Sequence, residues 1–147
     1  MKAVGIMAAG ILAHMVLGRW SPSPWLVPDL TALAMLASML RLPGHPIAPA
    51  VVASVAAMAL AVHHPAQSGL AYLLAGGLAK WMAHQWDLAQ PAIEWLIVAM
   101  CQTVLTLTLL TTIPPAADTL AWAALHVAIT LACLPVMQLL VPRSVGT

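Results

Sequence analysis

Long runs of apolar residues make up most of the chain, and short clusters of Pro, Gly and polar residues separate them. The runs are unbroken and rich in Ala and Leu, whereas the strands of a membrane β-barrel alternate polar and apolar residues over segments of about ten residues. The pattern therefore predicts an all-α integral membrane bundle of about six transmembrane helices. The expected helices cover residues 3–18, 28–40, 47–62, 69–86, 91–113 and 116–141.

Proline marks several of the expected boundaries. Pro28 occupies a favoured first helical position, Pro114 and Pro115 end the fifth segment, and Pro135 is expected to kink the sixth. A membrane helix needs roughly 17–25 residues, so the second and third segments are short. We expect them to cross the membrane with local thinning of the bilayer. The alternative is a re-entrant hairpin sheltered by protein.

The composition agrees with a membrane location. Of 147 residues, 63% are hydrophobic and 6% are charged, whereas soluble domains carry about 25% charged residues. This excludes a soluble enzyme, a nucleic-acid-binding protein and a disordered chain. Six crossings would use nearly all of residues 1–147, so we expect a single transmembrane domain with no separate folded domain of about 50 residues.

The few basic residues predict an orientation. With six crossings, Lys2, Arg41, Lys80 and Arg143 fall on the side of the two termini, and Arg19 falls on the other side. Because cytoplasmic loops carry an excess of Lys and Arg, both termini are expected in the cytoplasm.

One polar stripe carries both signs of charge. Lys80, His84 and Asp87 have the i, i+4 and i+7 spacing of one helix face. Ionisable groups in or near a span are costly and are functional candidates by default. The alternative is a cytoplasmic helix end whose side chains reach the lipid head groups.

The remaining acidic residues stand near expected helix starts. Asp29 follows Pro28, Glu94 lies in the first turn of the fifth segment, and Asp118 precedes the sixth. A carboxylate favours the positive end of a helix, and Asp118 is expected to cap its helix.

Six histidines raise the question of a metal site. His63 and His64 are adjacent, but His45 belongs to a loop on the opposite side, and a metal site needs three or four converging ligands. His14 and His126 lie inside apolar segments, where they can hydrogen-bond across helices. No nucleophile, base and acid stand in a triad-like pattern. We therefore expect no metal, no cofactor and no enzymatic activity.

Small residues recur at helix-packing positions. Gly5, Ala9 and Ala13 stand four apart, a spacing that lets another helix approach closely, either from the same chain or from a partner. Further residues expected to serve close helix packing are Gly69, Gly76 and Gly77. In the fifth segment, hydroxyl groups are expected to bond back to the helix backbone, with a polar lining for a substrate path as the alternative. The hydroxyl groups are those of Thr103, Thr106, Thr108, Thr111 and Thr112, and the amide of Gln102 lies among them.

The layout of the chain resembles the rod shape-determining protein MreD family over almost its whole length. A first apolar helix leads through a Trp- and Pro-containing loop to Pro28-Asp29-Leu30, which opens the second helix, and Arg41 ends that helix in a short basic turn. A small polar loop at 63–68 precedes Gly69-Leu70. The chain departs from the family in having no Asp near the end of the third helix, and in reducing the usual basic cluster after the fourth helix to Lys80.

The resemblance implies a non-enzymatic, multi-pass subunit of the bacterial inner membrane. Such proteins belong to the cell-elongation (rod shape) machinery and scaffold or regulate lateral peptidoglycan synthesis with MreC. The implied partners are membrane lipids, an MreC-like protein, RodA, a class B transpeptidase and, indirectly, MreB. Neither nucleic acid nor a small-molecule substrate is expected.

The same family is similar in fold to the substrate-binding subunits of energy-coupling-factor transporters. This supplies an alternative function, in which the chain binds a vitamin-like ligand between its helices and docks a membrane partner through Ala9 and Ala13. The two functions differ in what the helices enclose. A transport subunit needs a cavity of a few hundred Å³ with convergent polar groups, whereas a scaffold needs only a closed interior and an exposed partner face.

Overall fold

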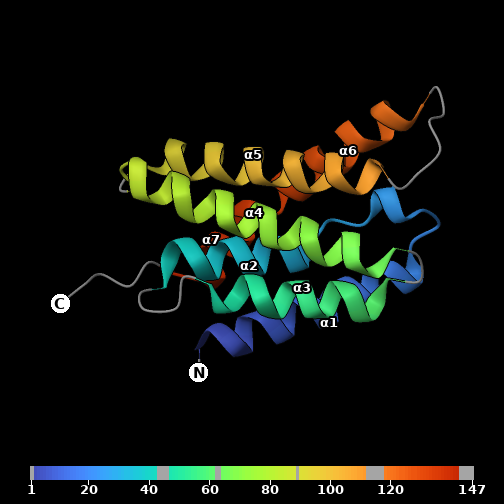
Figure 1. The fold of residues 1–147 in the computed structure, drawn as a ribbon, viewed down its shortest axis with the longest axis horizontal. Helices are drawn as coiled ribbons and strands as arrows, with labels where there is room; N and C mark the ends of the chain where they lie inside the picture. The colour runs from blue at the N-terminus through green and yellow to red at the C-terminus, as the bar shows by residue number, and fades with distance from the viewer. Residues whose placement is uncertain (1, 43–46, 62–63, 89, 112–117, 143–147) are drawn as a thin grey trace.

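The chain forms one bundle of helices that lie along a common direction (Figure 1). The computed structural model describes residues 2–42, 47–61, 64–88, 90–111 and 118–142. All regular secondary structure in these ranges is helical, which confirms the all-α prediction for them. The elements are α1 (Lys2–Trp20), the short 3-10 helix η1 (Pro24–Leu26), α2 (Leu30–Arg41), α3 (Ala48–Leu60), α4 (Pro65–Gln85), α5 (Pro91–Leu110), α6 (Thr119–Ala132) and α7 (Leu134–Leu140).

Helix α2 is the centre of the bundle. It contacts α1, α3, α4, α5 and α7, and every residue from Thr31 to Ser38 is buried. A helix that is apolar all round is expected to be buried in this way. With 12 residues, α2 spans only about 18 Å at about 1.5 Å per residue. The other helices therefore surround both of its ends, at Asp29 and Arg41.

Among the described residues, three helical stretches are long and apolar enough to cross a membrane, which indicates a membrane protein. They are Lys2–Trp20, Pro91–Leu110 and Thr119–Leu140, the last being α6 and α7 together. Helix α4 has 21 residues, within the roughly 17–25 residues that a crossing requires. Helices α2 and α3, with 12 and 13 residues, are short, as predicted, and α3 is shorter than the segment 47–62 expected for it.

Several helix boundaries differ from the prediction. Helix α4 begins at Pro65, so residues 65–68 are helical and not part of a loop that continues to Gly69. Proline is well suited to the first turn of a helix, and His64 before it has a left-handed backbone with φ 53°. Helix α5 ends at Leu110, three residues earlier than expected.

The predicted kink near Pro135 is present as a break between two helices. Helix α6 ends at Ala132 and α7 begins at Leu134, with Cys133 between them. Because proline has no N–H and its ring clashes with the preceding turn, Pro135 fits the first turn of α7 but not the interior of one continuous helix. The expected end of the fifth segment at Pro114-Pro115 and the expected start of the sixth at Ala116 lie outside the described residues.

Close packing of α4 against α3 explains two of the predicted glycines. A Cβ at Gly76 would lie 2.5 Å from Cβ of Ala50, and a Cβ at Gly69 would lie 2.5 Å from Cγ of Met58. Gly77 points elsewhere, since a Cβ there would meet nothing within 4 Å, so the packing expectation is wrong for this residue within the chain. A glycine that was not singled out, Gly10, is the one that brings α1 against α2.

Candidate functional site

One buried residue, Asp29, joins three helices at the start of α2. Asp29 is 3% exposed, and its side chain caps α2 by accepting a hydrogen bond from the backbone N–H of Ala32 at 2.9 Å. The hydroxyl of Tyr72 on α4 donates to the same carboxylate, at 3.0 Å from one oxygen and 2.9 Å from the other. The backbone N–H of Asp29 donates to Oγ1 of Thr130 on α6 at 2.9 Å. The expectation that Asp29 supports a helix start is confirmed, and its role in joining helices is additional.

The hydrogen bonds made by the described residues leave some acceptor positions of the Asp29 carboxylate unused. An ionised carboxylate has about four acceptor positions, and the Tyr72 hydroxyl and the Ala32 N–H supply one hydrogen each. The ion pair found among the described residues is between Arg41 and Glu94, and none includes Asp29. Because an unpaired buried charge is costly, a cation beside this carboxylate would be stabilised.

A cavity of about 270 Å³ lies beside this carboxylate, and we call it the Asp29 cavity. Its lining side chains come from α1, η1, the start of α2, α4, α5 and α6. They are His14, Trp25, Asp29, Tyr72, Thr106, Leu109 and His126. A second cavity of about 190 Å³ shares His14, Tyr72 and Leu109 with it.

Two imidazoles line the Asp29 cavity. Nδ1 of His14 lies 3.2 Å from the carbonyl oxygen of Pro28, and since a carbonyl can only accept, we assign the hydrogen to this nitrogen. The predicted bond of His14 thus reaches the connection that precedes α2, and not a second helix. Nδ1 of His126 is buried and has no hydrogen-bond partner in the described part of the chain. The ring of His126 instead packs edge-on against Trp25, with 6.0 Å between the ring centroids and 83° between the planes.

The threonines of α5 divide into two groups. Thr103 and Thr108 donate to the carbonyls four residues earlier, each at 2.8 Å, as predicted for hydroxyls in a membrane helix. Thr106 is 3% exposed, and its hydroxyl has no partner among the described residues. Thr106 lines the Asp29 cavity, so its hydroxyl contributes to a polar lining and does not bond back to its own helix. Thr112 lies outside the described residues.

The other end of α2 is held by a buried ion pair that the sequence did not predict. The guanidinium of Arg41 contacts both carboxylate oxygens of Glu94, a bidentate geometry typical of strong Arg–carboxylate pairs. Nη1 of Arg41 also donates to the backbone carbonyls of Gln138 and Val141, at 2.9 and 3.0 Å. These carbonyls belong to the last turn of α7 and its cap, which leave acceptors without partners inside the helix. Glu94 lies in the first turn of α5 as expected, but its carboxylate faces Arg41.

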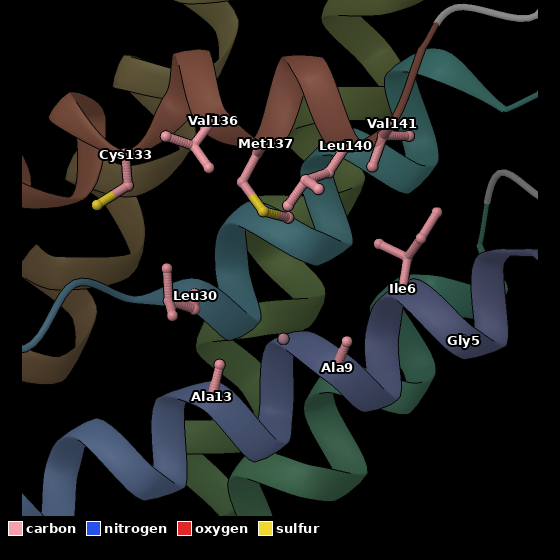
Figure 2. A pocket seen from close by; sticks show the side chains of 11 residues that line it. Gly5, Ile6, Ala9, Ala13, Leu30, Cys133, Val136, Met137, Leu140 and Val141 are labelled. Atoms are coloured by element: carbon pink, nitrogen blue, oxygen red, sulfur yellow. The ribbon is translucent and has the colours of Figure 1, made fainter.

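An apolar groove of about 480 Å³ runs between α1 and α7, and we call it the α1–α7 groove. Figure 2 shows Ile6, Ala9 and Ala13 directed from α1 toward α7. The residues that line the groove are Gly5, Ile6, Ala9, Gly10, Ala13, Leu30, Cys133, Val136, Met137, Leu140 and Val141. A Cβ at Gly5 would meet nothing within 4 Å, so the predicted small-residue stripe borders an open groove and does not pack tightly inside the chain.

The predicted stripe of Lys80, His84 and Asp87 does not form one helix face. Helix α4 ends at Gln85, and Trp86 has an extended backbone, so the prediction is wrong for Asp87. Lys80 and His84 do share a face of α4. All three side chains are exposed, and none of them lines the Asp29 cavity.

A metal centre finds no support in the ranges that the structure describes. They contain no group of three or more His, Cys, Asp or Glu residues that could hold a metal ion. His45 and His63 lie outside these ranges, while His64 is exposed just before α4.

The fold and these features define a helical membrane protein with a polar cavity at one end of its central helix and an apolar groove along its first helix. Comparison with known proteins gives no match to a family model, a curated protein or a solved structure. The function therefore follows as a proposal from the residues described above.

Proposed function

We propose that the chain is a non-enzymatic, multi-pass subunit of the bacterial inner membrane that docks the membrane helix of an MreC-like protein in the cell-elongation machinery. RodA and a class B transpeptidase would associate with this pair, and MreB would do so indirectly. The α1–α7 groove is the observation that carries the docking role, and the family resemblance carries the choice of partner. The layout of the chain, with Pro28-Asp29-Leu30 and Arg41 at the two ends of α2, supplies the family resemblance.

The groove has the properties that a helix-docking surface needs in lipid. Small residues on α1 let a second backbone approach closely, which is what drives helix association where lipid tails are as apolar as side chains. Only Met7 and Gly10 of α1 are buried in the chain. The remaining face of α1 is thus accessible to a partner helix.

The family-like residues support the same proposal through the fold. Asp29 and Arg41 hold the two ends of α2, and Leu30 at the start of α2 lines the groove. Both side chains are used in structural hydrogen bonds, so the short motif at each end of α2 is explained by stabilisation of the fold and requires no catalytic role.

A second candidate is a substrate-binding subunit of an energy-coupling-factor-type transporter, and the Asp29 cavity favours it. Its volume of about 270 Å³ lies just below the range of about 300–1,000 Å³ typical of ligand pockets. A scaffold alone requires no polar cavity. The α1–α7 groove does not discriminate, because either kind of subunit would dock a partner helix through Ala9 and Ala13.

Purification of the tagged full-length chain from native membranes tests the two candidates. Recovery of an MreC-like protein and wall-synthesis proteins is expected, whereas recovery of transporter ATPases would overturn the first candidate and support the second. Ala9→Leu fills the groove and is expected to reduce recovery of the partner. Ala8→Leu is the matched control, because Ala8 is exposed on α1 but does not line the groove.

A further inference from the structure

We propose that the Asp29 cavity binds a small organic ammonium ion, with the carboxylate of Asp29 as its counter-ion and the ring of Trp25 against its body. The inference goes beyond the docking role, which needs no ligand. If the second candidate function holds, it names the class of substrate.

The electrostatic argument starts from Asp29. Its carboxylate is buried and belongs to no ion pair among the described residues. From these residues it receives two hydrogens, one from the Tyr72 hydroxyl and one from the Ala32 N–H. It therefore has acceptor positions left over and a negative charge that is costly to bury alone. A cation in the neighbouring cavity would donate to the free acceptor positions and would neutralise the charge.

Two other polar groups of the cavity lining can accept a hydrogen bond from a ligand. In the tautomer with the hydrogen of His14 on Nδ1, facing Pro28, Nε2 is an acceptor. The hydroxyl of Thr106 is buried without a partner and can accept as well as donate. An ammonium group has donors and no acceptor, which complements such a lining better than a carboxylate ligand would.

The shape of the cavity argues for an organic cation and against a metal ion. A volume of about 270 Å³ is far larger than an ion requires, and the described residues offer no cluster of three metal ligands. Trp25 lies at the cavity, with its ring held edge-on by His126. Indole rings attract cations through their negative faces, and Leu109 adds an apolar contact surface.

The test uses the purified full chain in lipid nanodiscs with three probes of similar size, namely benzylamine, benzyl alcohol and benzoate. Calorimetric titration and the thermal unfolding midpoint report binding. Benzylamine, which is protonated at neutral pH, is expected to bind at least about tenfold more tightly than the other two, a factor that corresponds to about 1.4 kcal/mol. Equal binding of benzyl alcohol and benzylamine, or no binding of either, would overturn the proposal.

Two variants connect the binding to the cavity. Asp29→Asn keeps an oxygen that can cap α2, since Asn caps as well as Asp, but it removes the charge, so benzylamine binding is expected to fall about tenfold. Asp118→Asn is the control, and binding should not change. The prediction that Asp118 caps α6 through its side chain is wrong, because this exposed N-cap residue makes no side-chain cap bond. Unchanged binding by the Asp29→Asn chain contradicts the proposal.

A second variant keeps the test decisive if Asp29→Asn fails to fold. Thr106→Val preserves the volume but removes the unpartnered hydroxyl, and it is expected to weaken benzylamine binding while leaving the unfolding midpoint of the empty protein unchanged or higher. A higher midpoint together with unaltered benzylamine binding would overturn the role of the cavity. Recovery of partner proteins is a separate readout, so the docking proposal and the ligand proposal can fail independently.

Discussion

The guanidinium of Arg41 binds the carboxylate of Glu94 at two points, with 2.5 Å from Nε to Oε1 and 2.8 Å from Nη2 to Oε2. The side chains are 10% and 2% exposed, so the pair is almost fully withdrawn from solvent. The remaining nitrogen of Arg41 holds two carbonyls at the end of α7. One side chain thus fastens α2, α5 and α7 at the same end of the bundle.

Removing one partner of this pair is expected to destabilise the protein strongly. Glu94→Gln leaves the Arg41 charge buried without its counter-ion, which costs about 3–5 kcal/mol in buried pairs. Unfolding in detergent, followed by circular dichroism, measures the loss. Asp118→Asn is the control because Asp118 is exposed and its side chain makes no cap bond. A double variant with Arg41→Met and Glu94→Met should lose less unfolding free energy than Arg41→Met alone and Glu94→Met alone lose together. Strict additivity of the three values would contradict the coupling.

The hydroxyl of Tyr72 is predicted to stabilise the start of α2. Tyr72→Phe removes the donor to both oxygens of Asp29, and hydrogen bonds to charged groups contribute about 1.5–3 kcal/mol. The free energy of unfolding should fall by that amount. Thr103→Val is the matched control, since its hydroxyl is exposed and bonds only to its own helix. Equal stability of the two variants would show that Asp29 does not depend on Tyr72.

The sequence predicted features that depend on neighbouring residues. The break near Pro135, the helix start at Asp29 and the back-bonding of Thr103 and Thr108 all follow from chemistry within one turn of a helix. The boundary at Pro65 was missed because a polar loop and the first turn of a helix beginning with proline have similar compositions.

Contacts between helices could not be predicted in the same way. Glu94 and Arg41 are 53 positions apart, and Tyr72 and Asp29 are 43 apart. Spacing fixes only which residues share one helix face, while these pairs depend on which helices become neighbours. The same holds for the Asp29 cavity. Its lining residue Asp29 belonged to a recognised motif, but nothing in the sequence joined it to Thr106 or His126.

Two adjacent glycines on α4 are predicted to respond in opposite directions. Gly76→Ala places a methyl group 2.5 Å from Cβ of Ala50, and overpacking of this kind costs about 1–3 kcal/mol. At Gly77 a Cβ meets nothing within 4 Å, so Gly77→Ala should gain about 0.5–1 kcal/mol from the lower helix propensity of glycine. Thermal unfolding of the two variants checks both signs. A stable Gly76→Ala protein would mean that α3 and α4 are less closely packed.

The orientation in the membrane can be tested with single cysteines in a chain that carries Cys101→Ala and Cys133→Ala. If both termini are cytoplasmic, an impermeant thiol reagent added to intact cells should label Pro22→Cys, which follows α1. It should label Gln85→Cys, at the end of α4, only after permeabilisation. Both native residues are exposed, so accessibility reports the side of the membrane and not burial in the protein. The opposite labelling pattern would reverse the orientation that the positive-inside rule predicts.

Leu42→Cys in the same background distinguishes two crossings by α2 and α3 from a re-entrant hairpin. Leu42 follows the last residue of α2. If α2 and α3 cross, this position lies on the cytoplasmic side and is labelled only after permeabilisation. If they form a hairpin that enters and leaves on the outer side, Leu42→Cys stays in protein or membrane and resists the reagent even in permeabilised cells. The contacts of Arg41 favour the first result, because they join the end of α2 to the start of α5 and the end of α7. If the N-terminus is cytoplasmic, an even number of crossings separates it from the start of α5 and from the end of α7, so both lie on the cytoplasmic side.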